Sequence, residues 1–178
     1  MLMRVVAAVA VLAGLLAGGA ARAGEDLAIE AFSGQFVGTG IAENEQSESL
    51  ALTLRDLDVR ITPDDGGFAL SWTTVLRAAD GSGVKRKAGA IYFVPTDQAG
   101  VFRAAIDMDP LAGLPFVWAR IQGETLTVHS LLVNNEGSYE IQTYDRTLTG
   151  DGMDLKFTRV RDGQPMRTVT GKLARVGG

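Results

Sequence analysis

The sequence predicts an all-β protein, an antiparallel up-and-down β-barrel of about eight to ten strands. Apolar and polar residues alternate with a period near two through most of the chain after residue 25, as they do in strands with one buried face. Short clusters of Gly, Asp, Asn and Pro interrupt the alternation, and no window after residue 25 keeps a helical period for more than two turns. Short turns without a long crossover favour a barrel, and a two-sheet sandwich is the alternative.

The first 23 residues have the three-part composition of a cleaved secretory signal. Arg4 gives a positive start, residues 5–20 are an uncharged run of Val, Ala, Leu and Gly, and Ala21 and Ala23 precede a cleavage site at Gly24. This run is shorter than the roughly 20 residues that a membrane-spanning helix needs. We therefore expect a signal peptide at residues 1–23 and a single barrel domain at residues 24–178. A periplasmic or secreted location follows, without a lipid anchor because the chain has no cysteine.

Charge and composition exclude several classes of function. The chain has 17 basic and 21 acidic residues, and loss of the leader with its two Arg takes the net charge from −4 to −6. This sign disfavours nucleic acids and anionic membrane surfaces as partners. With no cysteine and one histidine, thiol catalysis and zinc sites built from several Cys or His are excluded. We expect no metal and no cofactor, and the oligomeric state stays open.

The first expected strands follow one another closely. They comprise residues 32–41, 50–62, 68–76 and 84–95, with turn residues at 63–67 and 80–83. Within the second strand, the leucines of residues 50–54 are in one phase and the apolar residues of 57–61 are in the other. This change of phase predicts a β-bulge or bend at Arg55-Asp56. The basic residues at 85–87 suit an edge protected by charge.

The strand pattern continues to the end of the chain. Further strands are expected at residues 102–106, 116–121, 126–132, 139–149, 155–160 and 166–175. Hairpin turns between them are indicated by Gly123, by the Asn-Asn-Glu-Gly run at 134–137 and by Asp162-Gly163. Several strands lack a continuous apolar face and aromatic residues are few, so a soluble barrel is favoured over an outer-membrane one.

The first expected strand carries a resemblance to a known family. Residues 32–40 (FSGQFVGTG) resemble the start of calycin barrels, the lipocalins and their bacterial relatives. Gly34 matches the family's glycine, and Phe36 stands where the family usually has tryptophan. Residues 143–146 (TYDR) are similar to the family's Thr-Asp-Tyr segment in a permuted order. The family's late arginine, which packs over that tryptophan, corresponds to Arg159 or Arg175.

The resemblance implies a cup with an apolar interior that binds a small hydrophobic molecule. Its wall would come from the apolar strand faces, which supply the candidate ligand-binding residues Phe36, Trp72, Phe93, Phe102, Trp118 and Ile141. The alternative is that these side chains fill a closed core. Asp145 and Arg146 are the candidate polar anchor, since a charge inside the cup needs a partner. A solvated outer face with cross-strand ion pairs is the alternative for these two residues.

An apolar loop at residues 108–115 interrupts the strands. Met108, Leu111 and Leu114 are expected to form a lid or entrance loop, or to plug one end of the barrel, and a partner site is the alternative. No catalytic residue is expected, because His129 and Ser130 are adjacent on a strand and point to opposite sides. We therefore expect an exported barrel that binds a small apolar or amphipathic ligand. The alternatives are a barrel enzyme that uses carboxylate and tyrosine groups, and a packed structural or interaction domain of the cell envelope.

Overall fold

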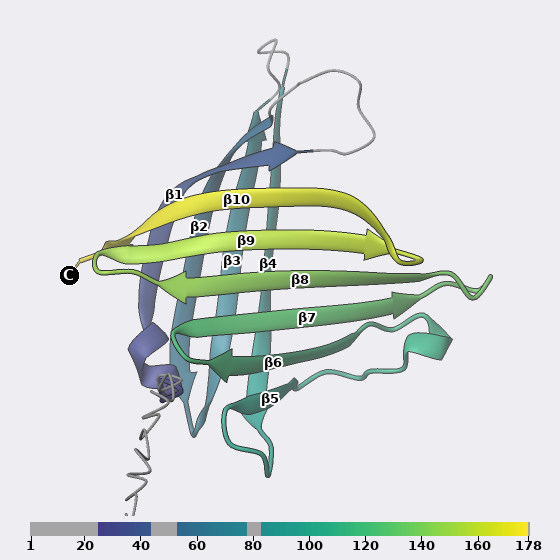
Figure 1. The fold of residues 1–178 in the computed structure, drawn as a ribbon, viewed down its shortest axis with the longest axis horizontal. Coiled ribbons are helices and arrows are strands. Elements are labelled where there is room, and N and C mark those ends of the chain that lie inside the picture. The colour runs from purple at the N-terminus through teal and green to yellow at the C-terminus, as the bar shows by residue number, and fades with distance from the viewer. Residues whose placement is uncertain (1–24, 44–52, 78–82, 178) are drawn as a thin grey trace, which may run out of the picture.

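A computed structural model describes residues 25–43, 53–77 and 83–177, and these residues form a closed barrel of ten strands (Figure 1). Each strand pairs antiparallel with its neighbour in the chain, and β1 closes the barrel by pairing with β10. The strands are β1 (Gly34–Glu43), β2 (Thr53–Asp64), β3 (Gly67–Arg77), β4 (Val84–Pro95), β5 (Val101–Ala104), β6 (Phe116–Gln122), β7 (Thr125–Val133), β8 (Tyr139–Leu148), β9 (Gly152–Arg161) and β10 (Gln164–Val176). The predicted up-and-down barrel is confirmed, whereas the expected leader at residues 1–23 lies outside the described residues.

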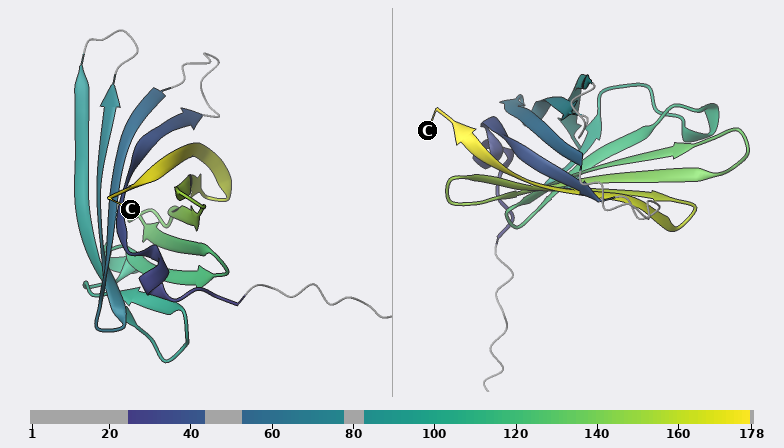
Figure 2. Two further views of the ribbon diagram at one scale, coloured as in Figure 1. Left: turned by 90° about the vertical axis from the view of Figure 1, so that its left-hand side faces the viewer. Right: turned by 90° about the horizontal axis from the view of Figure 1, so that it is seen from above.

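The barrel is flattened into two layers that run across each other. Strands β1 to β4 form one layer and β6 to β10 form the other, and Figure 2 shows the two layers facing each other across the interior. Helix is limited, in the described part of the chain, to two short 3-10 turns, η1 (Ile29–Phe32) and η2 (Pro110–Ala112). No described helix is long and apolar enough to cross a membrane.

Two Asp-Gly pairs close hairpins as the sequence predicts. Asp65 and Gly66 have φ angles of 44° and 75°, and Asp162 and Gly163 have φ angles of 48° and 77°. Two successive residues with positive φ make the type I′ turn, whose twist matches that of the strands on either side. Aspartate and glycine tolerate this backbone conformation better than most residues. The local sequence therefore sets the β2–β3 and β9–β10 connections.

An apolar floor lies at the end of the barrel next to η1. Phe32 and Phe36 are completely buried there. The ring of Phe68 stacks on Phe93 with centroids 4.6 Å apart, and it meets Phe102 edge to face at 5.2 Å. These rings belong to one hydrophobic cluster that also contains aliphatic residues of β2, β6, β7 and β9. Burial of this cluster is the main stabilising contribution at the floor.

A single arginine of β10 contacts the segment around η1 at the floor. The guanidinium carbon of Arg175 lies 4.6 Å from the centroid of the Phe36 ring. Arg175 also donates hydrogen bonds to the carbonyl oxygens of Ser33 and Ala31, beside η1. Of the two arginines that the sequence leaves open for this place, the structure therefore selects Arg175. Arg159 lies elsewhere, in the other half of the interior.

The β-bulge predicted at Arg55-Asp56 does not form. Strand β2 pairs with β1 and with β3 in an unbroken register on both sides. Leu54 is therefore exposed on the outer face, and Arg55 takes an inward position in the same series as Leu57 and Val59. The change of phase in the sequence reflects an arginine inside the barrel rather than an extra residue in the strand.

Part of one edge of strand β4 has no partner strand among the described residues. This strand pairs with β3 from Val84 to Phe93, but it pairs with β5 only at Phe93, Val94 and Pro95. The basic residues 85–87 lie in the part that has one partner strand, and they are exposed. Charge on a free strand edge disfavours pairing with another chain. The sequence pattern of this segment is consistent with that arrangement.

Candidate functional site

The barrel interior contains a cavity of about 200 Å³ in the half away from η1. The inward-facing residues of β2 change along the strand from the apolar Ile61 near the floor to Arg55 at the cavity. Those of β9 change in the same way from Met153 to Arg159. The cavity therefore has an apolar base and a polar upper wall. Its lining comes from six strands and includes the residues Arg55, Leu57, Val59, Trp72, Lys87, Gln142, Tyr144, Arg146, Phe157, Arg159 and Arg167.

Positive charge dominates this lining. Its cationic residues are Arg55, Lys87, Arg146, Arg159 and Arg167, and no carboxylate side chain is among the described residues that line it. Burial lowers the pKa of Arg55, and the charge of nearby Arg167 lowers it further. Like charges held at short range in a partly dry cavity repel each other. Such an arrangement is suited to a negatively charged guest.

Arg146 is the most deeply buried of these cations. Only 3% of its surface is exposed, and its cross-strand neighbours are Leu126 on β7 and Leu155 on β9. Its Nε and Nη1 atoms are buried and have no hydrogen-bond partner among the described residues. Its guanidinium carbon lies 5.5 Å from the centroid of the Tyr144 ring. Burial lowers the pKa of Arg146 to about 10, so the side chain remains charged at neutral pH.

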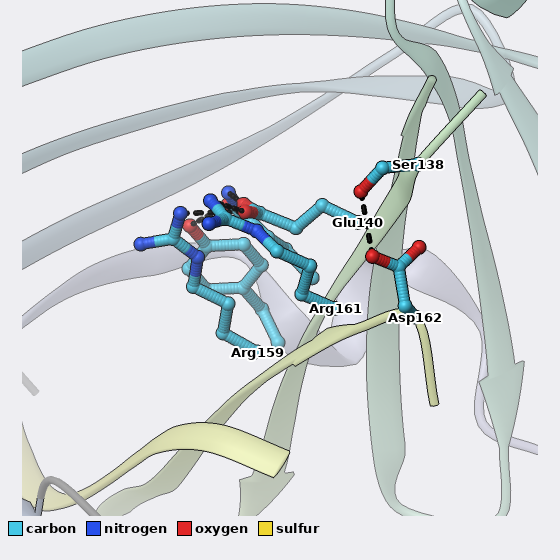
Figure 3. A network of polar contacts seen from close by, with 7 residues as sticks. Ser138, Glu140, Arg159, Arg161 and Asp162 are labelled. Atoms are coloured by element: carbon cyan, nitrogen blue, oxygen red, sulfur yellow. Dashed lines mark hydrogen bonds and ion pairs between the residues drawn. The ribbon is translucent and has the colours of Figure 1, made fainter. Parts of the chain in front are cut away.

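Glu140 neutralises part of the positive charge beside the cavity (Figure 3). Its Oε2 atom accepts hydrogen bonds from Nη2 of Arg159 at 2.5 Å and from Nη2 of Arg161 at 3.1 Å. Gln142 donates to Oε1 of Glu140 at 2.7 Å, and the Tyr144 hydroxyl donates to Gln142 at 3.1 Å. Burial alone would raise the pKa of Glu140, but the hydrogen bonds from Arg159, Gln142 and Arg161 hold it below its ordinary value. Both carboxylate oxygens of Glu140 therefore already accept hydrogen bonds from side chains of this network. In contrast, Nε of Arg159 has no partner among the described residues.

A second polar contact shown in Figure 3 holds the neighbouring hairpins together. Ser138 donates its hydroxyl to Asp162 at 2.7 Å, and the backbone N–H of Tyr139 donates to the same carboxylate at 2.9 Å. These hydrogen bonds lower the pKa of Asp162. They join the β7–β8 connection to the β9–β10 turn. These contacts therefore hold in place the end of β9 that carries the two arginines bound to Glu140.

Aromatic side chains form the apolar walls of the cavity. The rings of Tyr144 and Phe157 lie with centroids 4.7 Å apart on neighbouring strands. Burial raises the pKa of the Tyr144 hydroxyl, which therefore stays protonated. On the opposite layer, Trp72 lies over Gly89, where a Cβ atom would come within 2.5 Å of the indole ring. A glycine at this position makes room for the indole against β4.

The six apolar residues predicted to line a cup have three different locations. Phe36, Phe93 and Phe102 fill the closed floor. Trp72 lines the cavity. Trp118 and Ile141 point outward, because the inward positions of their strands belong to their sequence neighbours Val117 and Glu140. The expectation that all six face the interior is therefore wrong for Trp118 and Ile141.

The predicted Asp–Arg pair is also divided between the two faces. Adjacent strand residues point to opposite sides, so Arg146 faces the interior and Asp145 faces outward. Asp145 accepts a hydrogen bond from the Thr127 hydroxyl at 2.8 Å and lies across from Lys156 on β9. It therefore provides no counter-charge inside the barrel. Of the predicted pair, only Arg146 is positioned to contact a molecule in the cavity.

The apolar loop does not plug the barrel. Met108 packs against the hydrophobic cluster, and its sulfur accepts a hydrogen bond from the backbone N–H of Val117 at 3.2 Å. In contrast, Leu111 is 85% exposed and Leu114 is 44% exposed. The reason is local, since Asp109 caps η2 through the N–H groups of Leu111 and Ala112 and carries these residues away from the interior. The lining of the cavity contains none of the three apolar residues of this loop.

His129 takes part in an outer aromatic contact. Its ring stacks on Trp118 with centroids 4.7 Å apart, and its Nδ1 atom lies 3.3 Å from the Thr143 hydroxyl. Burial lowers its pKa, and the effect exceeds the opposing influence of Asp145. Ser130 lies on the other face of β7, as expected from strand geometry. Within the described residues, no group of three or more His, Asp or Glu side chains is placed to hold a metal ion.

Most of the polar cavity residues are not predicted from the sequence. The sequence pattern predicts a bulge at Arg55, offers Arg159 as a floor arginine or a solvated strand position, and does not single out Gln142 or Arg167. Arg55 could have been recognised from the sequence, because it lies two residues before Leu57 and therefore shares the inward face of Leu57 and Val59 in a regular strand. For Arg159 and Arg167, the alternation of β9 and β10 predicts two faces but does not say which face is inside. Their convergence depends on the closure of the barrel.

Comparison with known proteins supports the fold. No protein-family model matches the sequence, and no curated protein matches it. The chain is similar to a solved protein of unknown function from the DUF3598 family of Nostoc punctiforme, with a TM-score of 0.57 and 14% identity over 85% of this chain. It spans 50% of the length of that protein. An S-type phycobiliprotein lyase, CPES from Guillardia theta, aligns with a TM-score of 0.40 and 11% identity over 85% of this chain and 94% of that protein. The likeness to the Nostoc protein concerns the fold alone.

Proposed function

We propose that this protein is an exported barrel that binds a small amphipathic molecule in its interior cavity. The observation that carries the proposal is a cavity of about 200 Å³ with aromatic walls and with buried polar atoms that have no partner in the described part of the chain. This volume corresponds to about seven water molecules, or to one small organic molecule. Binding sites typically combine an apolar lining with a few convergent polar groups. The remaining space in this half of the barrel does not favour the alternative of a fully packed structural domain.

The two tryptophans allow a direct test, because one lines the cavity and the other lies on the outer face. Trp118→Phe leaves Trp72 as the fluorescent reporter, and Trp72→Phe leaves Trp118. We expect eight-carbon amphiphiles to change the fluorescence of the Trp118→Phe protein in a saturable way and to leave the Trp72→Phe protein unchanged. Equal responses from both proteins, or no saturable response from Trp72, would contradict binding in the cavity.

The export part of the proposal depends on the leader predicted at residues 1–23. In a bacterial host, the protein is expected in the periplasmic or secreted fraction with Gly24 as its first residue. Intact-mass measurement of the purified protein checks the cleavage position. A mass that retains residues 1–23 in a cytoplasmic protein would contradict export without affecting the cavity argument.

A further inference from the structure

We propose that the cavity recognises an amphipathic anion, whose acidic group, a carboxylate or a phosphate, binds the guanidinium of Arg146. This inference rests on the proposed function and adds the chemical class of the ligand. Arg146, Arg55 and Arg159 supply the donors for the acidic group, and the aromatic walls receive the apolar body.

The first argument is the state of Arg146. A buried charge is costly unless it is paired and hydrogen-bonded. Arg146 is fully charged at neutral pH and lies across from two leucines, yet its Nε and Nη1 atoms have no partner among the described residues. The hydrogens of these two atoms point from different edges of the planar guanidinium, so each edge keeps a donor for an oxygen of a carboxylate or phosphate. An anionic group of the ligand would supply the missing partners.

The second argument is the local charge balance. Five cationic side chains line the cavity, whereas the nearest interior carboxylate, Glu140, already accepts hydrogen bonds from Arg159 and Arg161. Asp145 faces away from the cavity and is bound by Thr127. The interior therefore has more positive than negative charge among the described residues. A neutral or cationic ligand would leave that imbalance in place, and an anion would reduce it.

The third argument is the position of the apolar surface. Tyr144 and Phe157 form one aromatic wall, and Trp72 forms another on the opposite layer. Leu57 and Val59 complete the apolar part of the lining. A free inorganic anion would use the arginines but would leave these walls uncovered. The combination therefore fits an acid that carries an alkyl or aromatic body.

The test compares four probes that share one eight-carbon chain: octanoate, octyl phosphate, 1-octanol and octylammonium. Binding is followed through Trp72 in the Trp118→Phe protein. We expect at least one of the two anions to bind about tenfold or more tightly than the alcohol, as a charge-assisted hydrogen bond to a buried arginine requires. The tighter of the two anions distinguishes a carboxylate from a phosphate. If octanol or octylammonium binds as tightly as both anions, the inference fails while the proposed function stands. Absence of binding by all four overturns both.

A matched pair of variants assigns the effect to Arg146. Arg146→Met keeps an unbranched side chain up to the position of Nε and removes the charged guanidinium, and Arg86→Met makes the same change at an exposed position on β4. We expect Arg146→Met to lose tenfold or more affinity for the preferred anion while its affinity for octanol stays within about threefold. Arg86→Met should keep both affinities. Equal loss for the anion and for octanol would indicate a damaged cavity and would overturn the role of Arg146.

A stability measurement keeps this result interpretable. Because an unpaired buried charge disfavours the folded state, the ligand-free Arg146→Met protein should melt at the same or a higher temperature than the parent protein. A lower melting temperature in the absence of ligand would show that the guanidinium has internal partners. That outcome would also overturn the inference.

Discussion

Individual charged residues divide the barrel interior into two regions. Arg175 is satisfied at the floor by the Phe36 ring and by two backbone carbonyl groups. Glu140 is satisfied by Arg159, Arg161 and Gln142. Arg146 differs in having two buried donor atoms that lack partners among the described residues, whereas Arg55 and Arg159 each have one. All three arginines line the cavity, where a ligand has room.

The Glu140 network should make stability depend on pH. The pKa of Glu140 is lower in the folded state than its ordinary value of 4.5, so its contribution is complete above that value and is lost as the pH falls through the lowered pKa. We expect Glu140→Gln to lower the free energy of unfolding by about 1–2 kcal/mol at pH 7. The difference from the parent should shrink as the pH falls from 5 to 3, as measured by urea denaturation. Glu136→Gln, at an exposed hairpin position, should show a smaller effect, and a Glu140 difference that does not vary with pH would contradict the assignment.

At the scale of elements, strand pairing brings together residues that lie far apart in the sequence. The β3–β4 register places Gly89 opposite Trp72, so the indole can approach the β4 backbone closely. The β8–β9 register likewise sets Tyr144 beside Phe157 and Gln142 beside Arg159. The shape of the cavity therefore depends on the register of these strand pairs as well as on side-chain identity.

Enlarging Gly89 should reshape the cavity without unfolding the barrel. A Cβ atom at Gly89 would come within 2.5 Å of the Trp72 ring, so Gly89→Val must displace the indole. We expect weaker binding of the eight-carbon probes by about tenfold and a shifted emission maximum of Trp72. Ala88→Val, on the adjacent exposed position of the same strand, is the matched control and should leave both quantities unchanged. Parent-like emission from Gly89→Val would contradict the contact.

For the whole molecule, the charge of the surface and the charge of the cavity have opposite signs. The chain has a net charge of −4, whereas the cavity lining is cationic among the described residues. Net charge governs long-range attraction to large partners, and it remains a sound reason to disfavour nucleic acids. It does not report on the local charge of a small cavity whose lining cations outnumber its carboxylates among the described residues. A negatively charged protein can therefore present a site for a small anion.

The stability of the whole barrel should depend on its apolar floor. Phe36 is completely buried between η1 and the strands, whereas Phe116 is 38% exposed on the outer face. We expect Phe36→Ala to reduce the free energy of unfolding by about 3–5 kcal/mol, because it removes a large side chain and leaves a void. Phe116→Ala should cost less than about 1 kcal/mol. Urea denaturation measures both, and comparable losses would contradict the division between floor and outer face.

The sequence alone determined the all-β class, the up-and-down order and the positions of most turns. These features are local: the alternation of residues marks strands, and Asp-Gly pairs favour type I′ turns wherever they occur. The sequence did not determine which face of each strand lies inside, because a strand with apolar residues on both sides has no unique inner face. For this reason the sequence pattern wrongly predicts Trp118 and Ile141 inside the barrel and a bulge at Arg55.

Only the tertiary structure decided the composition of the site. Arg55 comes from β2, Arg146 from β8 and Arg167 from β10, and closure of the barrel between β1 and β10 brings them around one cavity. Closure also fixes the inner face of every strand at once, since residues paired across neighbouring strands share a face. The local sequence pattern was therefore sufficient to predict the barrel fold. The cationic cavity required the long-range strand pairing that no local pattern contains.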